Sequence, residues 1–211
     1  RKQKNIWLET HIWHAKRFKM KNLWGYKIPF SPTNKRFRAS YNAVVSNCLL
    51  QDISFHSCIE ISGPLNVLEE KFASITSRDC GLAFTAKCFL NGCREGEIDI
   101  FKKDSYPYGA LTRVSFLWKP TDDTLRTVWI FVHPGSYREL LSELIDIFEV
   151  KHNVDSLLIR NARYINSDMN LQILELKDTL NRFRLSGPRS MSVIRKALTI
   201  ATNFESNWTN Q

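Results

Sequence analysis

The tripeptide Ser-Gly-Pro occurs twice, at residues 62 to 64 and 186 to 188, each time between a strand-like and a helix-like segment. Proline suits the first turn of a helix and glycine relieves the tight turn before it, so each copy marks a strand-to-helix junction. Either common turn chemistry produced the two copies independently, or the chain contains an internally duplicated strand–helix–strand unit. Strands and helices are mixed without strict alternation, which predicts an α+β fold with a mostly antiparallel sheet and packed helices.

Most other elements are predicted by hydrophobic periodicity. Apolar side chains in strand-like patterns lie at residues 52–62, 111–120, 125–134, 156–165 and 171–176, and helical patterns lie at 65–75 and 135–150. Asn91-Gly92 lies between two strand-like runs and predicts a hairpin turn.

The N-terminal segment predicts a helix over residues 5 to 21. At 100° per residue, Trp7, His11, His14 and Phe18 fall on one stripe of such a helix. The following glycine and prolines predict an ordered loop over residues 24 to 36, and a further helical segment is expected near residues 35 to 50.

The positive charge of the chain is concentrated at one end. The formal net charge is +9, yet residues 1 to 41 contain eleven Lys or Arg and one acid, whereas residues 42 to 211 contain nineteen bases and twenty acids. We therefore expect a basic aromatic arm over residues 1 to 50 and an α+β platform over residues 51 to 211, together a fragment of a longer chain. Such an arm suits a polyanionic partner.

The arm interleaves basic with aromatic side chains, which is typical of an RNA-binding segment. Lys and Arg neutralise phosphates, and flat rings stack on unpaired bases. The alternatives are a basic helix docked on its own core, a membrane surface or an acidic protein; Trp7 and Phe18 are expected to pack. A second basic group follows on a predicted strand, where a solvated sheet face is the alternative. The candidate RNA-binding residues are Arg1, Lys2, Lys4, His11, Trp13, His14, Lys16, Arg17, Lys19, Lys21, Trp24, Tyr26, Lys35, Arg36, Arg38, Arg182, Arg184 and Arg189.

Other kinds of site find little support in the sequence. His11 and His14 could share a metal ion, but no further ligands lie nearby, so we expect them to stack or hydrogen-bond instead. The nucleophile elbow, the phosphate loop and the dinucleotide fingerprint are absent. No Cys-x-x-Cys occurs among the five cysteines, which favours reduced thiols, although Cys88 and Cys93 could meet across the expected hairpin. We expect no cofactor, no metal, no small-molecule substrate and no membrane insertion.

Several long stretches resemble one protein family. "WLETHIWHAKRFKM" (7–20), "WGYKIP" (24–29), "SPTNKRFRASY" (31–41) and "CLLQDISFHSCIEISG" (48–63) closely resemble the Pop-one family, the largest protein subunit of nuclear ribonuclease P and ribonuclease MRP. "FLWKP", "VWIFVHP" and "LKDTLNRFRLSGP" are similar to its later segments.

This resemblance implies a fold similar to the aminomethyltransferase of the glycine cleavage system. It also implies a nuclear and nucleolar, non-catalytic scaffold that binds ribonuclease P RNA, MRP RNA and other protein subunits. The RNA then performs the cleavage in tRNA 5′-leader removal and rRNA precursor processing. The alternatives are a folate-dependent aminomethyltransferase-like enzyme and a basic protein-docking module.

Overall fold

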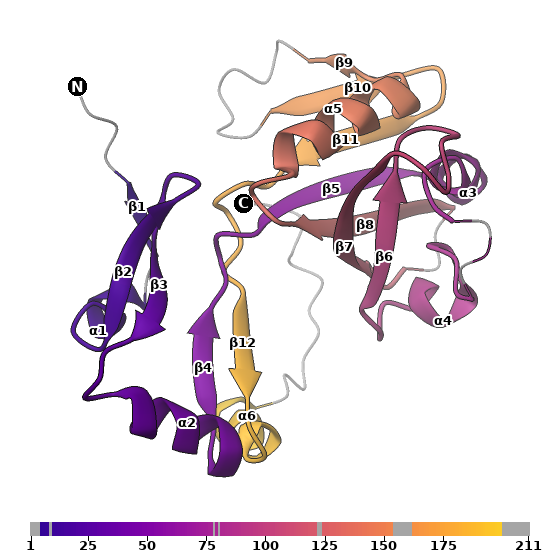
Figure 1. The fold of residues 1–211 in the computed structure, drawn as a ribbon. Helices are drawn as coiled ribbons and strands as arrows, with labels where there is room; N and C mark the ends of the chain where they lie inside the picture. Colours follow the sequence, from indigo (N-terminus) through magenta and orange to yellow (C-terminus); the bar gives the residue numbers. More distant parts are fainter. Residues whose placement is uncertain are drawn as a thin grey trace. The chain divides into compact units, whose positions relative to one another are not determined.

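The computed structural model describes residues 5–8, 10–77, 79, 81–121, 124–153 and 162–199 (Figure 1). The chain divides into two compact units. Unit 1 combines Arg1–Ile53 with Phe183–Gln211, and unit 2 is Ser54–Arg182. The division differs from the expected arm of residues 1–50 and platform of residues 51–211, because the chain from Phe183 onward pairs with the N-terminal segment.

Unit 2 is built on a seven-stranded sheet in which every neighbouring pair is antiparallel. In spatial order the strands are β6 (Gly96–Phe101), β7 (Ala110–Trp118), β8 (Leu125–Val132), β5 (Ser57–Pro64), β11 (Leu171–Glu175), β10 (Arg163–Asn166) and β9 (Lys151–His152). The expected strands at 52–62, 111–120, 125–134 and 171–176 are confirmed, with shifted ends. The expected strand 156–165 lies partly outside the described residues, and β10 covers its end.

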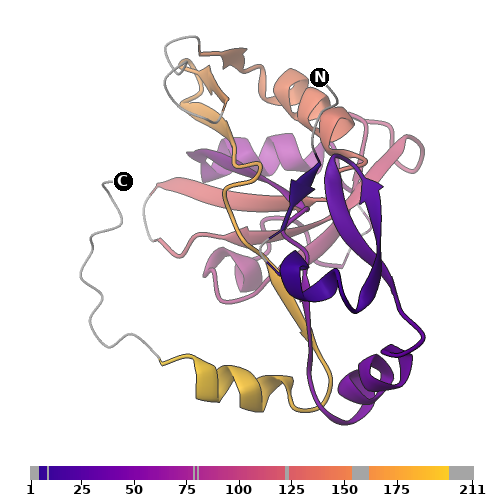
Figure 2. The ribbon, with the colours of Figure 1, turned by 90° about the vertical axis from the view of Figure 1, so that its left-hand side faces the viewer.

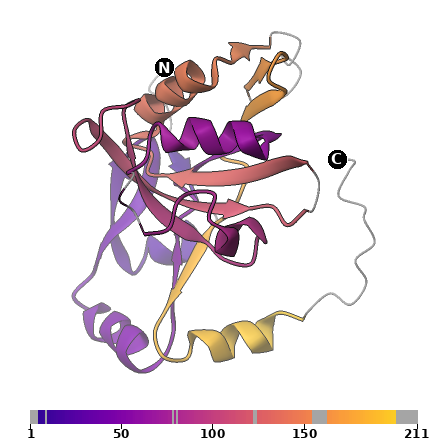
Figure 3. The ribbon, with the colours of Figure 1, turned by 90° about the vertical axis from the view of Figure 1, so that its right-hand side faces the viewer.

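The helices predicted at 65–75 and 135–150 are confirmed as α3 (Leu65–Ala73) and α5 (Tyr137–Phe148). Both cover one face of this sheet. Phe72 of α3 and Phe148 of α5 have ring centroids 5.4 Å apart, which places both helices over the same core (Figure 3). Alternation along the strands turns Ile59 and Ile61 toward this core, and both are fully buried.

The predicted hairpin at Asn91-Gly92 is wrong. These residues follow the short helix α4 (Lys87–Leu90), and β6 begins only at Gly96. Gly92 has a φ of +73°, and a Cβ at this position would lie 2.7 Å from the carbonyl oxygen of Trp118. The Asn-Gly pair therefore packs the end of α4 against the end of β7 instead of joining two adjacent strands.

The N-terminal part of unit 1 is a three-stranded sheet, not the helix predicted over residues 5 to 21. The order is β1 (Ile6–Trp7), β3 (Tyr26–Pro32) and β2 (Phe18–Leu23), and only α1 (His11–His14) is helical (Figure 2). Trp24 and Gly25 have φ values of 51° and 85°, the left-handed geometry of a two-residue hairpin turn, and they join β2 to β3.

The loop predicted over residues 24 to 36 is likewise wrong, because β3 occupies most of it. Its prolines are tolerated since β1 pairs only with Tyr26 and Lys27, which leaves the rest of that edge of β3 without a β1 partner. Pairing with β2 shifts register between Lys19 and Met20, near Pro29. A strand can therefore form where the prolines suggested a loop.

The rest of unit 1 joins the two ends of the chain. Helix α2 (Phe37–Ser46) confirms the helical segment expected near residues 35 to 50, and β4 (Leu49–Asp52) pairs antiparallel with β12 (Phe183–Ser186). Helix α6 (Ser190–Ala197) follows β12. Neither α2 nor α6 has a buried side chain among its described residues.

Both Ser-Gly-Pro copies join a strand to a helix, as predicted, but the two glycines act differently. Gly63 lies within β5, and a Cβ there would lie 2.4 Å from Cδ2 of Leu171. Gly187 has a φ of +121°, and its Cβ would lie 2.6 Å from the carbonyl oxygen of Asn47. The first glycine makes room for a neighbouring strand, and the second provides a backbone conformation that other residues rarely adopt.

Candidate nucleic-acid interface

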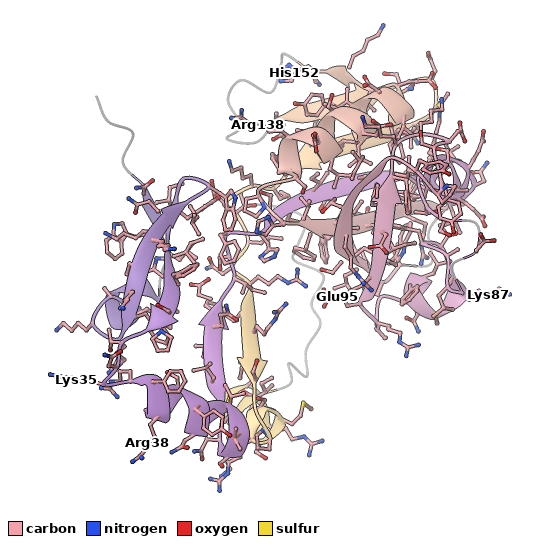
Figure 4. The ribbon with its side chains drawn as sticks, in the orientation of Figure 1. Lys35, Arg38, Lys87, Glu95, Arg138 and His152 are labelled. Atoms are coloured by element: carbon pink, nitrogen blue, oxygen red, sulfur yellow. The ribbon has the colours of Figure 1, made fainter. Side chains whose placement is uncertain are left out.

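Eight basic side chains of unit 1 lie in a stretch of sequence without a single acid. Residues 10 to 51 contain eight Lys or Arg and no Asp or Glu. Exposed side chains from this group are Lys16, Lys19, Lys21, Lys35, Arg36 and Arg38, while Arg17 and Lys27 are partly buried. Figure 4 shows Lys35 and Arg38 pointing away from the ribbon. A polyanion that approaches these residues meets little local repulsion.

Two of the lysines lie over exposed aromatic rings of the three-stranded sheet. Lys21 Nζ is 3.5 Å from the ring centroid of Phe30, and Lys27 Nζ is 4.8 Å from that of Trp7. By the strand register, Trp7 lies opposite Lys27 on one face of the sheet, whereas Lys21 lies opposite Ile28, on the face that carries Phe30. Each face of the sheet therefore presents one ring paired with one cation.

Both rings differ from the sequence-based expectation. Trp7 was expected to pack, but its side chain is 51% exposed. Phe30 was not among the candidates, and it is 58% exposed. The loop predicted over this segment gave Phe30 no face of a sheet to occupy, and strand alternation alone would have grouped it with the buried Tyr26 and Ile28.

Two of the predicted RNA contacts are core residues. His11 is fully buried and Tyr26 is 2% exposed, so neither side chain can reach an RNA at the surface. Nδ1 of His11 accepts a hydrogen bond from the backbone N–H of Leu8, 3.1 Å away. Burial lowers the pKa of His11 below its ordinary value, an effect that Asp52 partly opposes. His11 is therefore a neutral core histidine.

The predicted ring stripe exists although the long helix does not. Successive ring centroids are 6.1 Å apart for Trp7 and His11, 6.4 Å for His11 and His14, and 5.3 Å for His14 and Phe18, all edge to face. The single turn of α1 carries the two middle rings, so each of the four rings contacts the next one along the chain. The two histidines therefore pack against neighbouring rings, as the expectation of stacked histidines states.

The three C-terminal arginines of the expected group are divided between the two units. Arg182 belongs to unit 2, where its guanidinium donates to Ser115 Oγ at 3.0 Å, pairs with Glu95 and lies 4.2 Å from the ring centroid of Phe131. Arg184 and Arg189 belong to unit 1 and are exposed. Arg182 is therefore engaged within its own unit, because strand β12 begins only after it.

Some predicted features cannot be placed or find no counterpart. Arg1, Lys2 and Lys4, as well as the side chain of Trp13, lie outside the described residues. Trp24 is 46% exposed at the tip of the β2–β3 turn.

Within the described ranges no three His, Cys, Asp or Glu side chains are arranged to hold a metal ion, and no helix has the length and apolar character to cross a membrane. Cys88 and Cys93 are both free thiols.

Comparison with known proteins gives one family and one fold. Residues 1–64 match the family model described as "Ribonucleases P/MRP protein subunit POP1, N-terminal". The human ribonucleases P/MRP protein subunit POP1 is 41% identical over 144 residues, which cover 66% of this chain and 14% of that protein. The Caenorhabditis elegans subunit popl-1 is 28% identical over 199 residues, 92% of this chain and 24% of that protein. The chain thus spans about a quarter or less of the length of these relatives.

A solved structure shows the fold. The glycine cleavage system aminomethyltransferase T from Bartonella henselae superposes with a TM-score of 0.55 at 12% identity, over 91% of this chain and 43% of that one. The predicted fold class, α+β with a mostly antiparallel sheet and similar to this transferase, is therefore confirmed. At this identity the likeness concerns the fold and not the transferase activity.

Proposed function

Because this chain belongs to the family of ribonucleases P/MRP protein subunit POP1, we propose that it is a non-catalytic scaffold whose unit 1 binds the RNA of such a particle. In this proposal the chain stabilises the catalytic RNA for tRNA 5′-leader removal and rRNA precursor processing. Its partners are ribonuclease P RNA, MRP RNA and other protein subunits, in the nucleus and nucleolus.

The observation that carries the proposal is the basic stretch of unit 1 over residues 10 to 51, which contains no acid. Six exposed Lys and Arg side chains lie in a stretch of 42 residues that contains no carboxylate side chain. Cations in contact with phosphates release condensed counterions, so such a surface binds RNA with an affinity that falls steeply with salt. Exposed rings beside the cations add a second mode of contact, because unpaired bases stack on them.

Unit 1 is suited to recognise the shape of an RNA and not its sequence. Phosphate contacts position a protein on a nucleic acid, whereas base edges carry the sequence information. Folded RNA also offers loops and bulges with unstacked bases to aromatic side chains. We therefore propose that unit 1 follows the backbone of a folded RNA and uses exposed rings such as Trp7 and Phe30 where bases are unpaired.

A paired charge substitution tests this assignment. Lys19 and Lys21 are exposed on strand β2 of unit 1, and Lys87 and Arg138 are exposed on unit 2 (Figure 4). Lys19→Ala with Lys21→Ala is expected to weaken RNA binding and to reduce the slope of log K against log salt by roughly 0.7–0.9 for each lost phosphate contact.

The control removes two positive charges from unit 2 by Lys87→Ala with Arg138→Ala. This control lowers the net charge of the chain by the same amount. It therefore distinguishes direct phosphate contacts on unit 1 from attraction of RNA by the net charge. An equal loss of slope in both double variants would show that the phosphates do not lie on unit 1. An acidic polypeptide that competes as well as RNA of equal charge would favour the protein-docking alternative.

A further inference from the structure

Residues from the segments 14–18 and 36–43 of unit 1, each of which contributes one arginine, line a small pocket together with Leu49. It has a volume of about 200 Å³ and is lined by His14, Arg17, Phe18, Arg36, Ala39, Ser40, Ala43 and Leu49. We infer that this pocket takes a single unpaired nucleotide of the bound RNA, with the base against the aromatic wall and the phosphate near the two arginines. The inference rests on the proposed RNA-binding function and adds a defined site to it.

The walls of the pocket suit a flat ring. Phe18 and His14 meet edge to face, with ring centroids 5.3 Å apart and planes at 69°. The opposite wall is helix α2, where the small side chains of Ala39 and Ala43 lie one turn apart and so leave room between them and the rings. A nucleobase is a planar group that stacks on aromatic side chains regardless of its identity.

The charge around the pocket suits a phosphate. Arg17 and Arg36 both line it, and guanidinium groups match phosphate geometry better than ammonium groups do. None of the lining residues is acidic. Asp52, the nearest acid along the chain, is 2% exposed and accepts a hydrogen bond from Thr10 Oγ1 at 3.1 Å.

The remaining polar groups can read a base only weakly. Burial lowers the pKa of His14, an effect that Asp52 partly opposes and Arg17 reinforces, so its ring is neutral at pH 7 and can donate and accept hydrogen bonds. The hydroxyl group of Ser40 can do the same. Because both can donate as well as accept, we expect the pocket to distinguish a base from no base more strongly than one base from another.

The size of the pocket argues against a larger ligand. Pockets for drug-sized molecules have volumes of roughly 300–1,000 Å³. The volume of about 200 Å³ is below this range, so it suits one ring system and not a folate-sized molecule.

The test uses three RNA hairpins with the same stem: one with a single-nucleotide bulge, one with an abasic residue at the bulge, and one fully paired. Fluorescence anisotropy with the 211-residue chain gives the three dissociation constants. We expect the bulged hairpin to bind about tenfold more tightly than the abasic one, as base–aromatic stacking provides.

Two variants of helix α2 locate the effect. Ala39→Phe fills the pocket, and we expect the ratio of the two dissociation constants to fall to about one. Asn42→Phe places the same ring at an exposed position of α2 outside the pocket lining, and it should leave the ratio unchanged. Arg36→Ala should lower the affinity for the bulged hairpin more than Arg38→Ala, although each removes one positive charge near the start of α2.

The outcomes separate this inference from the function on which it rests. If the wild-type chain binds all three hairpins equally with a steep salt slope, or if Ala39→Phe keeps the preference for the bulge, the pocket does not hold a nucleotide while RNA binding stands. Failure to bind any of the three hairpins would count against the proposed function itself.

Discussion

Trp7 offers the sharpest test of which side chains fold the protein and which contact its RNA. Its indole is 51% exposed, contacts His11 edge to face and lies under the ammonium group of Lys27. A buried Trp in a core costs about 3–5 kcal/mol when it is replaced by Ala. A half-exposed one should cost less, and the exposed half is available for a base.

The magnitude follows from the buried area. A fully buried Trp removes roughly 250 Å² from water, so burial of about half removes roughly 120 Å². At about 25 cal/mol per Å² this amounts to about 3 kcal/mol, and correction for a compact unfolded chain lowers it to about 2 kcal/mol. Loss of one stacked base should also weaken RNA binding by ~1–3 kcal/mol. A loss of about 1.4 kcal/mol raises Kd about tenfold.

Two measurements on Trp7→Ala therefore give both numbers. Urea denaturation followed by far-ultraviolet circular dichroism gives the free energy of unfolding, and filter binding at fixed salt gives the affinity for RNA. Trp7→Phe keeps a flat ring and should recover most of the binding. A loss of more than about 4 kcal/mol of stability with unchanged RNA affinity would show that the ring belongs to the core, contrary to our reasoning.

Three further predictions concern the fold. Phe84→Ala should lower the free energy of unfolding by about 4 kcal/mol in urea denaturation, because this 1% exposed ring stacks on two others with centroids 4.0 and 4.1 Å away; a loss below 1 kcal/mol would contradict that packing. Gly187→Ala should cost at least about 1–3 kcal/mol, since its φ is +121° and a Cβ would meet Asn47 at 2.6 Å; an unchanged thermal midpoint would refute the strained turn. Stability should fall as the pH drops below about 6.5, because burial lowers the pKa of His11 and His14 and the unfolded chain then binds protons more tightly; a flat profile of urea midpoints between pH 7.5 and 5.5 would contradict this.

The elements that were predictable from the sequence are those set by local pattern. Alternating apolar residues predicted β7 and β8, and the helical spacing of Leu140, Leu144 and Ile147 predicted α5. The Ser-Gly-Pro copies predicted two strand-to-helix junctions. The concentration of Lys and Arg at the N-terminal end was also visible, since the net charge of a segment depends only on its composition.

The elements that were not predictable depend on long-range pairing. The spacing of Trp7, His11, His14 and Phe18 mimics a helix, yet pairing between β2 and β3 makes residues 18–23 a strand. Nothing local indicates that β4 pairs with β12, which is more than 130 residues away. The pocket could not be foreseen for the same reason, because it requires α1, β2 and α2 to come together.

The central claim is that this chain binds a cognate folded RNA through unit 1, and one measurement tests it most directly. Filter binding across a salt series would compare ribonuclease P RNA, an unrelated structured RNA and duplex DNA. We expect a steep salt slope with a clear preference for ribonuclease P RNA, and we expect the preference to weaken in the Lys19→Ala, Lys21→Ala double variant. Equal affinity for all three nucleic acids at every salt concentration, or no binding to any, would contradict the claim.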